Sequence, residues 1–189
     1  MRLVPRLLIP LAMGLLALSA GCASHSGSGS SGYPEESWYA QRQRAAQEAR
    51  FRRSYEAVFD ESAEEGGPRQ AKAVQVARSA IGTPYVPGGR NPGGFDCSGF
   101  TSYIYKQFGV TLNRSSKDQV NNGVAVSKSN LQQGDLVFFS TNGVYPTHVG
   151  IYIGDGNIVH ASTAKDGVKI SSLNTSYYTT NYFAARRIV

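Results

Sequence analysis

The sequence predicts an α+β domain in which two core helices precede a small antiparallel sheet. Two stretches between residues 68 and 109 carry apolar side chains at helical spacing. The residues after 133 contain five short runs of β-branched and aromatic residues, separated by Gly, Asp and Asn. Because the helices come first and the strands follow, the order favours an α+β arrangement with the helices packed on one sheet.

The first core helix is predicted in "PRQAKAVQVARSAIG", residues 68–82. It starts at Pro68, which suits the first turn of a helix, and Gly82 suits its end. Val74, Ala77 and Ile81 lie on one face of this helix, so we expect that face to pack on the core.

The second core helix is predicted from Cys97 to about Gln107, with Gly109 as its stop. Residues 83–95, which separate the two helices, are rich in Pro and Gly and predict a loop. The core side of the second helix carries Phe100, Ile104 and Phe108. The strands that follow are predicted in "GDLVFF", "HVGIYI", "NIVHAS", "GVKISSL" and "YFAARRIV".

The chain begins with the features of an export signal. Arg2 and Arg6 precede an apolar run from Leu7 to Leu18, which is too short to count as a spanning helix. The sequence "LSAGC", ending at Cys22, resembles a bacterial lipobox, where the signal is removed and the new terminal cysteine is acylated. We therefore expect residues 1–21 to be a lipoprotein signal peptide and Cys22 to carry a lipid, including palmitate. The alternative is an ordinary cysteine in a polar linker.

Two segments separate this signal from the core helices. Residues 22–34 are rich in Gly and Ser and predict a flexible tether. Residues 35–66 have a helix-forming composition, and we expect a helical leader with an incomplete apolar stripe formed by Phe51, Tyr55, Val58 and Phe59. This leader could be a solvated spacer, or it could contact an envelope protein partner.

The positive charge of the chain is concentrated in residues 67–189. The whole chain has a net charge of +6, and this segment holds twelve Lys and Arg against five Asp. A basic surface can bind nucleic acid, but no basic stripe with interleaved aromatic residues is present. We therefore expect no nucleic-acid partner, and expect the charge to face anionic cell-wall material.

Cys97 stands at the start of the second predicted helix, in "GGFDCSGF". If Cys22 is acylated, Cys97 has no partner for a disulfide within the chain. Asp96 is expected to cap the helix, and the unpaired N–H groups and the dipole of the helix start favour a thiolate. The position therefore predicts a nucleophile with a lowered pKa. On this stretch alone, a small buried core cysteine is the alternative.

His148 and His160 lie on either side of the sequence "GDG". A hairpin with a three-residue loop would pair Ile153 with Asn157 and place His160 opposite Gly150. Because side chains alternate along a strand, His148 and Gly150 share a face, so both imidazoles would point to one side. The alternative is a pair of polar histidines on an exposed face of the sheet.

One cysteine and two histidines suit nucleophilic catalysis. A cysteine nucleophile needs an adjacent base, and the base needs a third group that orients it. His148 would take the proton of Cys97 and later protonate the leaving amine, while His160 would orient His148.

A zinc site is the alternative use of one cysteine and two histidines. Zinc sites usually include a carboxylate or another cysteine at close spacing as well, and no HxxxH or CxxC pair is present. We expect no metal and no other cofactor.

These residues resemble a known family. The sequences "GTPYVPGG", "FDCSGF", "QGDLVFF" and "HVGIYIGDGNIVHAS" occur in this order, and together they are similar to the NlpC family of papain-like cell-wall cysteine endopeptidases. With the lipobox, the chain resembles the Spr-type outer-membrane lipoproteins. The resemblance implies a papain-like catalytic domain over residues 67–189, with Cys97 as nucleophile, His148 as base and His160 as orienting residue.

The resemblance also implies residues that contact substrate. Tyr85 would lie beside the nucleophile, and Asp96 and Ser98 would contact polar groups of the stem peptide. Tyr85 could instead pack on the core, and Asp96 could serve only as a helix cap. Pro87 stands where the family often has a bulky residue, and Asn113 stands where proline is usual. The first departure bears on specificity, and neither affects the expected triad.

The expected function is hydrolysis of peptide bonds in peptidoglycan, at the periplasmic face of the outer membrane. The resemblance favours the bond between D-alanine and meso-diaminopimelate, and the bond between D-glutamate and diaminopimelate is the alternative. Ala23, rather than aspartate, follows the lipid-bearing cysteine and favours the outer membrane. A non-catalytic wall-binding lipoprotein is an alternative, but the joint presence of Cys97, His148 and His160 argues against it. An acyltransferase or amidase would use the same triad and would differ from a peptidase only in the walls of the cleft.

Overall fold

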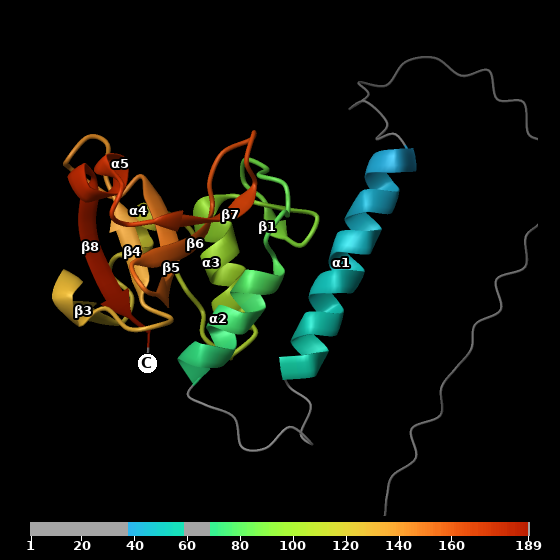
Figure 1. Ribbon diagram of the computed structural model, residues 1–189, viewed down its shortest axis with the longest axis horizontal. Helices are drawn as coiled ribbons and strands as arrows, with labels where there is room; N and C mark the ends of the chain where they lie inside the picture. Colours follow the sequence, from blue (N-terminus) through green and yellow to red (C-terminus); the bar gives the residue numbers. More distant parts are fainter. Residues whose placement is uncertain (1–37, 59–68, 189) are drawn as a thin grey trace, which may run out of the picture. The chain divides into compact units, whose positions relative to one another are not determined.

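The computed structural model describes residues 38–58 and 69–188 (Figure 1). The predicted signal peptide, the tether, Cys22 and the boundary near residue 67 lie outside the described residues and stay predictions. The described helices are α1 (Trp38–Val58), α2 (Arg69–Ser79), α3 (Cys97–Lys106), α4 (Ser116–Gln119) and α5 (Ser176–Thr180), with a 3-10 helix η1 (Lys128–Asn130). The described strands are β1 (Arg90–Asn91), β2 (Gly94–Phe95), β3 (Val124–Val126), β4 (Leu136–Phe139), β5 (His148–Gly154), β6 (Asn157–Ala161), β7 (Val168–Ser172) and β8 (Tyr182–Arg187).

The two predicted core helices are confirmed as α2 and α3. Helix α2 ends at Ser79, three residues before the predicted stop at Gly82. Helix α3 begins at Cys97 as expected, and Gly109 has a positive φ of 77° just beyond its end. Figure 1 shows α3 alongside β5 and β6, against which it packs.

All five predicted strands are present, and they belong to one six-stranded antiparallel sheet in the order β3-β8-β4-β5-β6-β7. The edge strand β3 was not predicted, because its short sequence "VAV" lies among polar residues. The predicted loop of residues 83–95 contains a small hairpin, β1 paired with β2. The short helices α4 and α5 were also not predicted, since four or five residues carry no readable helical period.

The sheet is buried on both faces by two separate hydrophobic clusters. One cluster fills the space between the sheet and the helices, with Phe100 and Ile104 from α3 packed among Val149, Ile151 and Val159. The second lies on the other face and includes Val137, Phe139, Ile158, Leu173 and Ala185. The central strand β4 is buried at all four residues because its side chains alternate between the two clusters.

Helix α1 accounts for the described part of the predicted leader. Phe51 is buried, and its ring packs edge-on against Tyr103 of α3 at a centroid distance of 5.2 Å. The side chain of Gln47 donates a hydrogen bond to Thr83 Oγ1 at 3.0 Å. These contacts contradict a purely solvated spacer over the described residues. The rest of the predicted apolar stripe, at Tyr55, Val58 and Phe59, falls outside the residues whose side chains are described. None of the described helices is long and apolar enough to cross a membrane.

Candidate active site

Asp96 caps the N-terminus of α3, as the sequence predicts. Its backbone is extended, with φ −90° and ψ 175°, and its Oδ1 accepts a hydrogen bond from the backbone N–H of Gly99 at 2.6 Å. The cap satisfies one of the N–H groups that a helix start leaves unpaired. It also places Cys97 at the first position of the helix.

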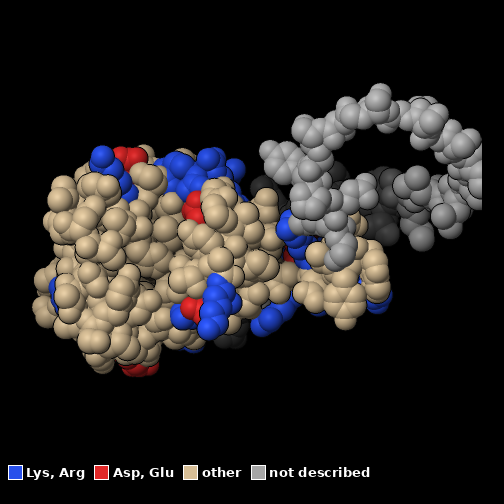
Figure 2. Space-filling model, turned by 90° about the horizontal axis from the view of Figure 1, so that it is seen from above, with Lys and Arg blue, Asp and Glu red and all other residues tan. Residues whose placement is uncertain are grey.

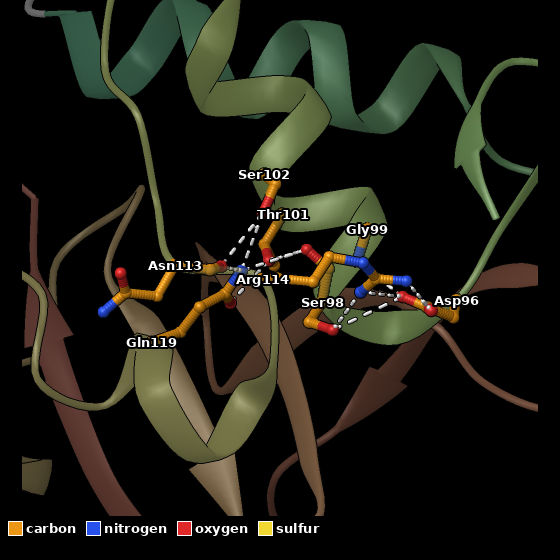
Figure 3. A network of polar contacts seen from close by, with 8 residues as sticks. All are labelled: Asp96, Ser98, Gly99, Thr101, Ser102, Asn113, Arg114 and Gln119. Atoms are coloured by element: carbon orange, nitrogen blue, oxygen red, sulfur yellow. Dashed lines mark hydrogen bonds and ion pairs between the residues drawn. The ribbon is translucent and has the colours of Figure 1, made fainter. Parts of the chain in front are cut away.

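Arg114 forms an ion pair with the carboxylate of Asp96 (Figure 3). Its Nη1 donates to Asp96 Oδ1 at 3.1 Å and to Ser98 Oγ at 2.9 Å, and its Nη2 donates to Asp96 Oδ2. Burial raises the pKa of Asp96, but the hydrogen bonds from Arg114 and Gly99 outweigh it and hold that pKa below its usual value. Asp96 is therefore a carboxylate at neutral pH.

A buried glutamine fixes the segment that carries Arg114. Gln119 of α4 accepts a hydrogen bond from Thr101 Oγ1 at 2.8 Å, and its Nε2 lies within 3.0 Å of Ser98 O, Ser102 Oγ and Asn113 O. Figure 3 shows these contacts joining α4 to α3. The sequence drew attention only to Asn113 in this region. The contacts of Arg114 and Gln119 with α3 could not be predicted, because no regular sequence spacing relates either residue to a helix that begins many residues earlier.

The thiol of Cys97 is partly buried and free of any disulfide. Burial raises its pKa, and the negative charge of Asp96 raises it further. The backbone N–H groups of Ser98, Val149 and Cys97 act in the opposite direction without offsetting these effects. The prediction of a lowered thiol pKa was therefore wrong, because desolvation exceeds the effect of the helix start. The effect of the Val149 N–H on this pKa agrees with the packing of α3 against β5, the strand that begins at His148.

His148 and His160 are in direct contact. His148 Nε2 lies 2.7 Å from His160 Nδ1, and the two rings are nearly perpendicular. The expected strand register is confirmed on this side of the hairpin, since Ile151 pairs with Val159 and this places His160 opposite Gly150. Both imidazoles point to one side of the sheet, as predicted.

The turn end of this hairpin differs from the prediction. Asn157 pairs with Gly154, not with Ile153, which is an extra residue at a bulge. The turn itself holds Asp155 and Gly156, with φ of 53° and 69°, the conformation that a two-residue hairpin turn requires. The bulge and the shorter turn compensate for one another, so the register at the histidines is unchanged.

His160 is almost fully buried and contacts two hydroxyl groups. Its Nε2 lies 3.0 Å from Ser171 Oγ and 3.1 Å from Tyr178 OH. Burial lowers the pKa of His148 to about 4 and that of His160 to about 3, so both rings are neutral at pH 7. The sequence reasoning missed Ser171 and Tyr178, because only the β6–β7 register and the fold of α5 bring them to His160.

Tyr85 lies at the same end of α3. It forms an isolated parallel bridge with Phe95, and it is half-buried against the main core. Burial raises the pKa of its hydroxyl, and the nearby Cys97 and Asp96 raise it further. A role of Tyr85 in contacting substrate beside the thiol stays a prediction. No group of three or more His, Cys, Asp or Glu in residues 38–58 and 69–188 is arranged to hold a metal ion.

An α+β domain with a cysteine at a helix start and a histidine pair on the adjoining sheet defines the papain-like class. Within that class, the chain belongs to the NlpC/P60 family, whose sequence profile matches residues 82–187. The predicted fold class and family are thereby confirmed.

Three similar proteins illustrate this membership. A Bacillus cereus protein named gamma-D-glutamyl-L-lysine dipeptidyl-peptidase is 44% identical over 122 residues, which are 64% of this chain and 37% of the relative. An Escherichia coli K12 protein named murein DD-endopeptidase MepS/murein LD-carboxypeptidase is 48% identical over 109 residues, 57% of each chain. The crystal structure of a Bacillus cereus NlpC/P60 family protein matches with a TM-score of 0.62 at 44% identity, over 65% of this chain and 41% of that one. Each match therefore spans less than two thirds of the relative's own length.

Proposed function

We propose that this protein is a peptidoglycan endopeptidase that uses Cys97, His148 and His160. The observation that carries the proposal is the 2.7 Å contact between the two imidazoles, on strands that pack against the helix beginning at Cys97. A nucleophile, a base and a group that orients the base are the three parts that cysteine catalysis needs. The names of the relatives, which are endopeptidases and peptidases, support the same reaction class.

The proposed reaction starts from a neutral thiol and a neutral imidazole. His148 takes the proton of Cys97 as the sulfur attacks the peptide carbonyl carbon, and a tetrahedral oxyanion forms. The backbone N–H of Cys97, at the helix start, is the proposed donor to this oxyanion. His148 then gives the proton to the leaving amine as the C–N bond breaks. A water molecule, deprotonated by His148, releases the acyl group from the sulfur.

Tyr85, Asp96 and Ser98 are proposed to contact the substrate beside the nucleophile. Tyr85 is close enough to Cys97 for the two groups to affect one another electrostatically. Ser98 Oγ already accepts a hydrogen bond from Arg114, and it donates its own hydrogen to Asp96 Oδ1, with 3.3 Å between the two oxygens. Asp96 therefore acts at least as a helix cap and as the partner of Arg114, and a substrate contact would add to these roles.

The favoured bond is the crosslink between D-alanine and meso-diaminopimelate. The 48% identity to the Escherichia coli protein named as a DD-endopeptidase supports this choice. The 44% identity to the Bacillus cereus dipeptidyl-peptidase supports the alternative, cleavage after D-glutamate. The basic character of residues 67–189 suits a polymer rich in carboxylates. On the face shown in Figure 2, Lys and Arg are more prominent than Asp and Glu.

The decisive experiment digests purified sacculi with the soluble domain and identifies the released muropeptides by mass spectrometry. Defined crosslinked dimers and uncrosslinked tripeptides, tested separately, distinguish the two candidate bonds. Cys97→Ala should abolish product formation while the thermal stability stays close to that of the parent. If the parent releases no new muropeptides under reducing conditions, the proposed hydrolase function is wrong and a wall-binding role is favoured. An equally active Cys97→Ala variant would exclude the mechanism.

The proposed location is the periplasmic face of the outer membrane, with a lipid on Cys22 and the leader of residues 35–66 available to an envelope partner. The lipobox-like sequence supports the anchor. Labelled palmitate should enter the full chain but not its Cys22→Ala variant, and only the former should fractionate with outer membranes. Equal labelling of both chains would contradict the anchor.

A further inference from the structure

We propose that Ser171 and Tyr178 are positioning residues that hold His160 in the tautomer with hydrogen on Nε2, and thereby leave Nδ1 of His148 free to act as the base. The inference rests on the proposed function for its kinetic consequence. The tautomer of His160 is a property of the folded protein, and it can be measured whether or not the protein catalyses a reaction.

The contacts of His148 leave it one free nitrogen. Its Nε2 lies 2.7 Å from His160 Nδ1, so Nδ1 is the nitrogen that remains for the thiol proton. A neutral imidazole carries one hydrogen. If Nδ1 is to accept a proton, the hydrogen of His148 must be on Nε2, and His160 Nδ1 must be the acceptor. His160 then carries its own hydrogen on Nε2.

The two hydroxyl groups favour this arrangement. A ring nitrogen has one lone pair, so as an acceptor it uses one donor, whereas a single N–H can be shared between two oxygens. Ser171 Oγ and Tyr178 OH both lie close to His160 Nε2, at 3.0 and 3.1 Å. His160 is 1% exposed, so water does not compete with these oxygens. Two adjacent oxygens on one buried nitrogen match an N–H donor better than a lone pair.

The opposite tautomer would block the base. With hydrogen on His160 Nδ1, that group would donate to His148 Nε2, and the hydrogen of His148 would move to Nδ1. His148 would then present an N–H to a protonated thiol and could not take its proton. The tautomer of His160 thus determines whether the resting enzyme has a base at all.

The placement of both hydroxyls comes from the fold around His160. Ser171 lies on β7, two residues from Lys169, which pairs directly with His160. Tyr178 extends from α5, and its ring packs edge-on against Phe139 at 4.9 Å. The charged groups that act on His160 are Lys169 and Asp166, which form an ion pair with each other at 2.7 Å, and His148 is the other titratable neighbour besides Tyr178.

The variants are chosen so that packing is kept. Tyr178→Phe retains the ring against Phe139 and removes only the hydroxyl, and Ser171→Ala removes one oxygen. Ser171→Thr restores a hydroxyl and serves as the conservative rescue. Tyr177→Phe is the matched control, because Tyr177 is the exposed neighbour of Tyr178 on the same helix.

The N–H on Nε2 of His160 can use either hydroxyl oxygen. Each single variant should therefore lose less than about threefold in kcat, and the double variant about tenfold or more.

Two measurements test the proposal. Nitrogen-15 NMR of the histidine rings in the parent, without substrate, should show His160 protonated on Nε2 and His148 unprotonated on Nδ1. The double variant should show a mixture of tautomers. Kinetics on a soluble muropeptide should show that the double variant lowers kcat with less than about a threefold change in KM, since neither residue is among the proposed substrate contacts.

Three results would overturn the inference: a parent with hydrogen on His160 Nδ1, a double variant with the parental tautomers, or a double variant with the parental kcat. The NMR measurement on the parent decides the matter even if the double variant does not fold. It also separates this inference from the proposed function. If the parent cleaves no muropeptide, the function fails while the tautomer is still measured.

Discussion

Arg114 forms an ion pair with Asp96 through both terminal nitrogens of its guanidinium group, and the same group donates to Ser98. The carboxylate is the cap of the helix that begins with the proposed nucleophile. One arginine therefore stabilises the helix start, keeps Asp96 charged and orients the Ser98 hydroxyl. A planar guanidinium can make this set of contacts and an ammonium cannot.

Removing the arginine should affect stability and activity together. Arg114→Ala leaves a largely buried carboxylate without its partner, which costs about 1–3 kcal/mol in the free energy of unfolding. The pKa of Asp96 should rise, and activity on sacculi should fall about tenfold or more as the start of α3 loosens. Chemical denaturation and muropeptide release measure the two effects. Arg114→Lys keeps the charge, so an activity equal to the parent in that variant would show that the paired geometry is unimportant.

The pH at which activity is lost on acidification should lie far below the usual pKa of an exposed histidine. His148 acts as a base only when it is neutral, and burial lowers its pKa to about 4. As the pH falls from 7, kcat/KM on a soluble muropeptide should hold until the pH approaches 4 and then decline, because protonation removes the base. A decline centred near the usual histidine value would contradict the burial of His148. Circular dichroism at each pH of the profile should confirm that the domain remains folded.

Gly150 leaves the space that the histidine pair needs. A Cβ added at this position would lie 3.1 Å from His160 Cβ, 3.1 Å from Ile158 Cδ1 and 3.3 Å from Val159 O, closer than ordinary contacts. Gly150→Ala should therefore shift His160, disturb its contact with His148 and lower kcat about tenfold. The loss of stability should be about 1–3 kcal/mol, as for other overpacked sites.

The control for that substitution is Ile158→Val. It removes a methyl group next to Gly150 and should cost about 0.5–1.5 kcal/mol of stability with no change in kcat. If Gly150→Ala lowers stability but leaves kcat unchanged, the fit between the two imidazoles is more tolerant than the structure indicates.

The parts of the fold that the sequence predicted are those that depend on local pattern. Alternating β-branched residues located the five strands, and the same alternation put His148 and His160 on one face. The expected register near His160 was right even though the turn was not, because the bulge at Ile153 cancels the shorter turn. Asp96 was predictable as a cap from its position before a helix.

The parts that could not be predicted depend on contacts between distant segments. Arg114 reaches Asp96 from a segment that the buried Gln119 joins to α3 through hydrogen bonds. Ser171 and Tyr178 meet at His160 through strand pairing and a five-residue helix. The pKa of Cys97 was wrongly predicted for the same reason. The helix start is visible in a sequence, but the extent of desolvation around a thiol is a property of the packed fold.

The contact of α1 with the rest of the domain gives the last prediction. Phe51 is buried at 3% exposure against Tyr103, and it is the described residue through which α1 joins the main core. Phe51→Ala removes that burial, and the loss of stability is limited to the free energy that holds α1 in place. Hydrogen exchange of residues 38–58 should become about tenfold faster or more, whereas strand β5 should keep its protection. Gln43→Ala, an exposed change on the same helix, is the matched control. Equal exchange of α1 in both variants would show that Phe51 does not hold the helix, and the leader would then behave as the solvated spacer that the sequence offers as one alternative.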